Sequence, residues 1–141
     1  MLKGIPPILS PQLLKVLCEM GHGDEIVLAD GNFPAAAVAQ RLIRCDGHNV
    51  GELLEAVLKF FPLDIYVDRP AALMAVVPGD DTKPTIWEKY RSIIAESGEK
   101  FSDFELVEKS AFYERAKKAY AVVATSEKAL YANIILKKGI V

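Results

Sequence analysis

Short runs of apolar residues, each about the length of one strand, alternate along this chain with amphipathic segments of helical periodicity. A strand that is apolar on both faces is typical of a sheet covered by helices on each side. The pattern therefore predicts an α/β fold, with residues 1–141 forming a single three-layer α/β/α domain around a central, mostly parallel sheet. Ligands of such sheets usually bind just beyond the ends of the strands.

Six strands are expected, and four helices. The strands are predicted over 26–29, 42–45, 71–77, 104–107, 120–124 and 133–136. The helices are predicted over 10–20, 51–61, 84–98 and 112–118. The first helix has the clearest start, because Ser10 is a good N-cap and Pro11 suits the first helical position. Gly21 gives this helix its stop.

Charge and cysteine usage exclude several classes of protein. The 17 basic and 19 acidic residues leave a net charge of −2, without the basic excess that nucleic-acid binding requires. The longest apolar run, 71–77, is far shorter than the ~20 residues of a membrane-spanning helix. Cys18 falls among the apolar positions of the first helix, so we expect a buried, reduced thiol. With no apolar core for a signal peptide near the N-terminus, these features predict a cytoplasmic protein that binds neither membranes nor nucleic acids.

The common catalytic and nucleotide-binding motifs are missing. The segment 21–26 has glycines around His22 but lacks the third glycine of the dinucleotide fingerprint, and it precedes a strand where that motif follows one. The chain contains no GxxxxGK[ST], HExxH or GxSxG. Nucleotide-binding, zinc-protease and serine-hydrolase functions therefore have no support in the sequence.

Four polar residues lie at the boundaries of the expected elements. His22, between two glycines, has an uncrowded imidazole, but taken alone it is better interpreted as a loop histidine near a helix C-terminus. Asp30 ends the first buried strand, where a carboxylate caps the next segment or faces a pocket. Asp64 alone reads as a turn aspartate, and His48 as a solvated turn residue.

The last third of the chain carries side chains that suit a monosaccharide. Tyr113 and Tyr131 combine an aromatic face with a hydroxyl, and Asn133 offers both a donor and an acceptor. Sugar hydroxyls bind such polar groups, while the C–H faces of a sugar pack on rings. The alternative is that both tyrosines fill the edges of the core, just as Met74 in mid-strand would ordinarily belong to the core.

Taken together, these segments resemble the L-fucose mutarotase family, which is related to the D-ribose pyranases. The resemblance covers nearly the whole chain. It is carried by 2–6, 10–14, 21–30 and 32–34, by Asp46-Gly47 and Pro62-Leu63-Asp64, and by 112–119, 131–133 and the segment to Gly139. Phe112-Tyr113-Glu114-Arg115 belongs to the fucose side of the family. Ribose-type members carry a second histidine in their latter half, and this chain has none after His48.

The resemblance implies roles for individual residues. His22 would be the catalytic proton donor, and Asp30 would bind the sugar. Further sugar contacts would come from Asp64, Met74, Lys109, Tyr113, Tyr131, Ala132 and Asn133. Relatives of bacterial type carry arginine in place of Lys109, and lysine keeps the charge but loses the planar fork. The family also implies a homo-oligomer, commonly a ring-shaped decamer, with sites at subunit contacts.

The implied reaction agrees with the residues present. Exchange of α and β anomers opens the sugar ring, as a proton reaches the ring oxygen and another leaves the anomeric hydroxyl. No redox step is needed, so we expect neither a cofactor nor a metal. An imidazole, with an ordinary pKa of about 6.5, transfers protons in both directions near neutrality. Two alternatives remain open: a D-ribose pyranase activity, and a non-catalytic protein for monosaccharide binding or transport.

Overall fold

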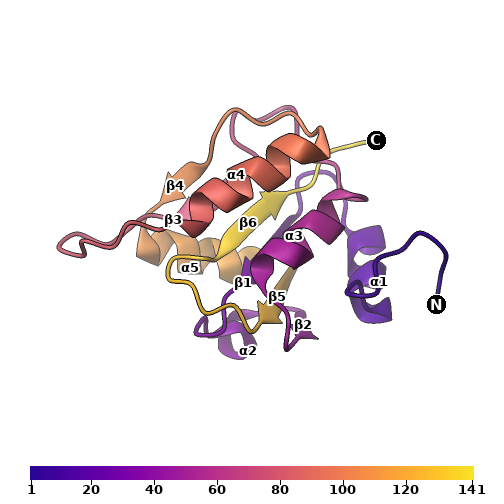
Figure 1. The fold of residues 1–141 in the computed structure, drawn as a ribbon, viewed down its shortest axis with the longest axis horizontal. Coiled ribbons are helices and arrows are strands. Elements are labelled where there is room, and N and C mark those ends of the chain that lie inside the picture. Colours follow the sequence, from indigo (N-terminus) through magenta and orange to yellow (C-terminus); the bar gives the residue numbers. More distant parts are fainter.

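A six-stranded sheet lies between two layers of helices in the computed structural model, which describes residues 1–141 (Figure 1). The strands are ordered β2-β5-β1-β6-β3-β4 across the sheet. They are β1 (Glu25–Ala29), β2 (Leu42–Cys45), β3 (Ala71–Met74), β4 (Glu105–Val107), β5 (Ala121–Thr125) and β6 (Ile134–Lys137). Only β6 runs antiparallel to its neighbours β1 and β3, and the other pairs are parallel. The expected α/β class, with a mostly parallel sheet, is confirmed.

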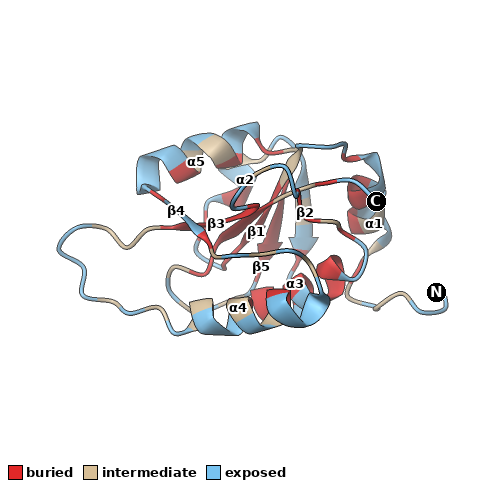
Figure 2. Ribbon diagram, turned by 90° about the horizontal axis from the view of Figure 1, so that it is seen from above, coloured by how far each residue is buried: buried red, intermediate tan, exposed pale blue.

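Five helices cover the two faces of this sheet. One face packs against α1 (Pro11–Glu19), α3 (Val50–Leu58) and α4 (Ile86–Ser97). The other face packs against α2 (Ala35–Val38) and α5 (Lys109–Lys118). Figure 2 shows α2 and α5 on one side of the buried strands, with α3 and α4 on the opposite side. No helix in the structure combines the length and the apolar character that crossing a membrane would take.

The strand β1 shows why its sequence is apolar at every position. Ile26 and Leu28 belong to the apolar core on one face of the sheet, whereas Val27 and Ala29 belong to the core on the other face. All four side chains are fully buried. Because successive side chains of a strand point to opposite faces, a strand buried on both sides loses the usual apolar–polar alternation.

Local capping sets where the helices begin and end. The Ser10 side chain accepts a hydrogen bond from the Leu13 amide at 3.2 Å, and Pro11 occupies the first turn of α1. Asn49 and Glu52 form a capping box at the start of α3. Gly98 ends α4 in the left-handed region, at φ 81°.

Two expectations from the sequence are wrong, one about the length of a strand and one about the burial of a cysteine. The strand expected over 71–77 ends at Met74, because β4 ends at Val107 and β6 begins only at Ile134, leaving residues 75–77 without a strand to pair with. The thiol of Cys18 is exposed, since α1 turns Leu13, Val16 and Leu17 toward the core and Cys18 lies round the helix from them. Sequence analysis also missed the short helix α2.

Candidate active site

Asp30 stands at the carboxyl end of β1, where the chain turns away from the sheet. Its backbone amide donates to the Asn133 side-chain oxygen at 2.7 Å. One oxygen of its carboxylate accepts hydrogen bonds from the amides of Asn32 and Phe33, each at 2.9 Å. The residue is buried. Burial raises the pKa of Asp30, and these amides, with the Asn133 side chain and the Ala132 amide, oppose that rise.

An aromatic and apolar wall lies beside Asp30. The rings of Phe33 and Tyr113 are stacked, with their centroids 5.2 Å apart and their planes 6° from parallel. Met74, at the carboxyl end of β3, is buried in the same apolar cluster, and Tyr113 and Tyr131 pack against that cluster. Lys109 is exposed at the start of α5, one helical turn before Tyr113. At the carboxyl ends of β1 and β3, polar groups therefore lie beside flat apolar faces.

A surface cavity of about 810 Å³ opens at this edge. It is lined by Ala75, Val76, Val77, Pro78, Leu106, Glu108, Lys109, Ser110 and Tyr113. The apolar residues 75–77, which the sequence pattern placed in a strand, form one wall of this cavity instead. Residues 75–77 are therefore apolar at a surface cavity, and they are not part of the sheet.

The segment 131–133 crosses the same edge just before β6. Tyr131 has a φ of 55° and is the one non-glycine residue with a positive φ. Its hydroxyl donates to an Asp80 carboxylate oxygen at 2.5 Å, and this bond raises the pKa of Tyr131. Ala132 and Asn133 are buried.

His22 lies with Asp64 at a different place. His22 Nε2 and Asp64 Oδ1 are 3.1 Å apart, and the same carboxylate oxygen accepts the Tyr66 amide at 3.0 Å. The Tyr66 amide, together with His22, lowers the pKa of Asp64, although partial desolvation works against this. The histidine side chain is 46% exposed and that of Asp64 only 5%. A charged, well-held carboxylate thus orients an accessible imidazole.

The two groups of side chains occupy opposite ends of the sheet. Gly23 and Asp64 donate their amides to the carbonyls of Lys138 and Lys137, at the end of β6, whereas Asp30 bonds to Asn133, before β6 begins. At ~3.3 Å per residue, β1 and its flanking residue hold these two edges about 16 Å apart. The structure brings together Asp30, Met74, Lys109, Tyr113, Tyr131, Ala132 and Asn133, and it places His22 and Asp64 elsewhere. We call the end of the sheet that carries the first group the aspartate edge, and the end that carries His22 and Asp64 the histidine edge.

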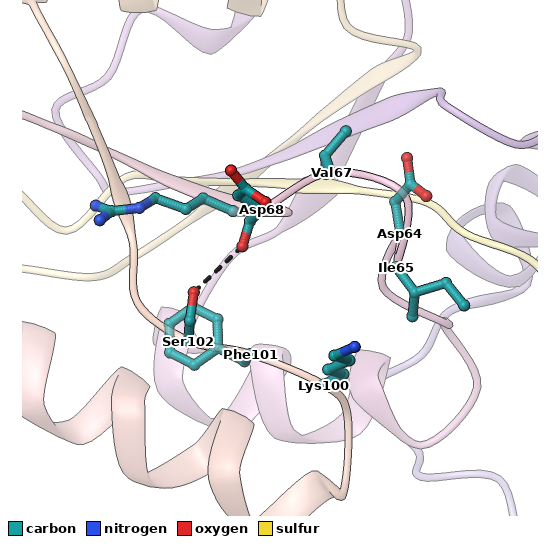
Figure 3. Close-up of a pocket in the computed structure, with 8 residues that line it drawn as sticks. Asp64, Ile65, Val67, Asp68, Lys100, Phe101 and Ser102 are labelled. Atoms are coloured by element: carbon teal, nitrogen blue, oxygen red, sulfur yellow. Dashed lines mark hydrogen bonds between the residues drawn. The ribbon is translucent and has the colours of Figure 1, made fainter.

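A second hollow, of about 520 Å³, adjoins the histidine edge and is shown in Figure 3. Asp64 lies on its rim, and its carboxylate points away from Lys100 and Ser102 on the opposite wall (Figure 3). Ser102 instead donates to the backbone carbonyl of Asp68 at 3.2 Å. The Asp64 carboxylate is therefore directed to His22 and not to this hollow.

Phe33, Tyr66 and His48 are not among the predicted site residues. The Tyr66 ring lies 5.5 Å from the His22 ring, and Phe33 supplies half of the aromatic wall, yet sequence reasoning gave neither of them a role. Each follows a site aspartate by two or three residues, which is the one signal that could have found them. His48 is exposed and pairs with Glu52 at 3.0 Å, as suits a solvated turn residue. No group of three or more His, Cys, Asp or Glu side chains is arranged to hold a metal ion.

Comparisons with known proteins cover the whole fold. The model of the RbsD / FucU transport protein family matches residues 3–141. A fucose mutarotase of Mus musculus is 56% identical over 98% of this chain and 94% of its own length. A fucose mutarotase from Streptococcus pneumoniae, solved in complex with L-fucose, is 57% identical, with 99% of each chain covered and a TM-score of 0.94. The Bacillus subtilis RbsD structure with D-ribose, 22% identical over 100% of this chain and 99% of its own, shares the fold at a TM-score of 0.74.

Proposed function

Because this chain belongs to the RbsD / FucU transport protein family, we propose that it is a cofactor-independent mutarotase that interconverts the α and β anomers of L-fucose. One observation carries the proposal: more than half of the sequence is identical, nearly end to end, to proteins named fucose mutarotase, one of them solved with L-fucose. The reaction makes this protein an isomerase that acts on carbohydrates.

The imidazole of His22 is the proposed acid and base. Ring opening needs a proton at the ring oxygen and the loss of one from the anomeric hydroxyl; the aldehyde then rotates and the ring recloses on its other face. Asp64 accepts a hydrogen bond from Nε2, so the neutral ring exposes Nδ1 as the basic nitrogen, and the protonated ring donates from it. General acid–base catalysis of this kind contributes about 10²–10⁴ in rate.

The aspartate edge is the proposed sugar-binding surface. The free lone pairs of the Asp30 carboxylate accept sugar hydroxyls, and the amide group of Asn133 lies beside it. Tyr113, backed by Phe33, and Met74 offer faces for the C–H groups of the sugar. Lys109, which lines the cavity with Tyr113, is a further proposed contact, as are Tyr131 and Ala132, the two residues before Asn133.

The separation of the two edges supports an oligomeric site. One sugar ring is too small to touch both edges of a single chain, so we propose that the histidine edge of one copy meets the aspartate edge of another. Beside His22, the residues Ile65 and Tyr66 are 54% and 68% exposed and offer apolar surface for such a contact. Repeated head-to-tail contacts close into a ring, in keeping with a homo-oligomer such as a decamer.

A cytoplasmic location stays a prediction, supported by two cysteines that form no disulfide.

Saturation-transfer NMR on equilibrated L-fucose tests the activity directly. We expect the native protein to accelerate anomer exchange and His22→Ala to abolish the acceleration while still binding sugar. His48→Ala is the matched control, because it removes the other histidine of the chain at an exposed turn. Full activity in His22→Ala would refute the assigned role. Exchange on D-ribose but not on L-fucose would favour a pyranase, and binding without exchange would favour a non-catalytic sugar-binding protein.

A further inference from the structure

Two aromatic side chains of α4 reach across to the segment that carries the proposed sugar contacts. Trp87 Nε1 donates to the Tyr131 carbonyl at 2.8 Å. The Tyr90 hydroxyl donates to the next carbonyl, that of Ala132, at 2.7 Å. Tyr90 and Ala132 are fully buried, so water cannot replace that bond. Neither aromatic residue lines the cavity at the aspartate edge.

The backbone of segment 131–133 needs such contacts to keep its conformation. Tyr131 adopts the left-handed region, which L-residues other than glycine rarely occupy and which persists only when surrounding contacts enforce it. Its hydroxyl is also fixed, because it donates to Asp80 and accepts the Val77 amide at 3.3 Å. A hydrogen bond from α4 therefore fixes the backbone of Tyr131, and hydrogen bonds with the loop after β3 fix its side chain.

The clamped segment in turn sets the surroundings of Asp30. The Asn133 side-chain oxygen receives the Asp30 amide at 2.7 Å. Thus α4 donates hydrogen bonds to the carbonyls of Tyr131 and Ala132, and the next residue, Asn133, accepts a hydrogen bond from the Asp30 amide.

We infer that Trp87 and Tyr90 are positioning residues for sugar binding: through the carbonyls of Tyr131 and Ala132 they keep segment 131–133 in the conformation that presents its side chains beside Asp30. This inference rests on the proposed function. It assigns no chemical step to either residue, because proton transfer belongs to His22 at the other edge of the sheet.

The variants Trp87→Phe and Tyr90→Phe test the inference, since each removes one hydrogen-bond donor and keeps an aromatic ring. We expect the KM for L-fucose, from saturation transfer at a series of sugar concentrations, to rise about threefold to tenfold in each variant. The kcat should change less than about twofold, because the histidine edge is untouched. Ser97→Ala is the matched control: it removes a side-chain donor to the Ile94 carbonyl at the far end of the same helix, and KM should not move.

The possible outcomes separate the inference from the proposed function. A KM equal to that of the native protein in both folded variants, or a fall in kcat at unchanged KM, would overturn the positioning role. If Tyr90→Phe does not fold, Trp87→Phe decides alone, since its bond is only partly buried. Should the native protein show no anomer exchange, the proposed function fails, and calorimetric titration with L-fucose then tests the positioning role through Kd.

Discussion

Mixing two inactive variants should restore activity if each site is shared between copies. His22→Ala damages only the histidine edge, and Asp30→Ala damages only the aspartate edge, about 16 Å away along β1. In a hybrid oligomer, an intact histidine edge on an Asp30→Ala chain can meet an intact aspartate edge on a His22→Ala chain. Such a site has every group that the proposed mechanism needs.

The expected recovery follows from how the chains combine. In a random mixture of equal parts, half of the histidine edges and half of the aspartate edges are intact, so about a quarter of the sites carry both. We therefore expect about a quarter of the native exchange rate when the two variants are expressed together or refolded as a mixture. Saturation-transfer NMR on L-fucose measures the rate at matched chain concentration.

A second mixture makes this experiment specific. His22→Ala combined with Asp64→Ala places both changes on the histidine edge, so every such edge is damaged and the mixture should be no more active than Asp64→Ala alone. If the mixture of His22→Ala and Asp30→Ala is no more active than its parents, the shared site is refuted. Recovery in the control mixture as well would show that the two edges do not act as separate units.

Three further changes have defined outcomes. Asp30→Asn should raise Tm at neutral pH while losing sugar binding, because burial raises the pKa of Asp30 and makes its charged form costly; the gain in Tm should shrink toward acid pH, where the native carboxyl becomes neutral, and a constant gain would contradict this. Gly139→Ala would place a Cβ 2.5 Å from the Leu63 carbonyl oxygen, so urea unfolding should show a loss of about 1–3 kcal/mol, and an unchanged midpoint would count against that crowding. Asp64→Asn should lower kcat by about tenfold or more, since the neutral amide no longer stabilises a protonated His22, and a native kcat would exclude this role of Asp64.

The element pattern was readable from the sequence because burial on both faces leaves a direct signature. The residues Ile26 to Ala29 are apolar at every position, and the structure buries all four. The pairing of β1 with β5 and β6 was not readable, since register such as Ile26↔Ala121 depends on contacts between distant segments. Apolar residues that line a surface hollow, such as 75–77, look the same in sequence as residues of a strand.

The site was predicted residue by residue more readily than as an arrangement. Asp30 and Asn133 were each expected to contact the sugar, and the structure joins them by a hydrogen bond. His22 is close to Asp30 in sequence, yet the extended strand between them carries it to the opposite edge. Composition and motifs give no sign of this separation, because it follows from strand length and from the position of β1 within the sheet.

The central place of β6 has a consequence for how this protein is made. It is the sixth strand along the chain, yet it lies between β1 and β3 and links the two halves of the sheet. Until residues 134–137 have been synthesised, a nascent chain holds two sheet fragments with exposed inner edges, β1 in one and β3 in the other. Such edges invite aggregation, so completion of this sheet is expected to wait for synthesis of β6 and to be sensitive to chaperones.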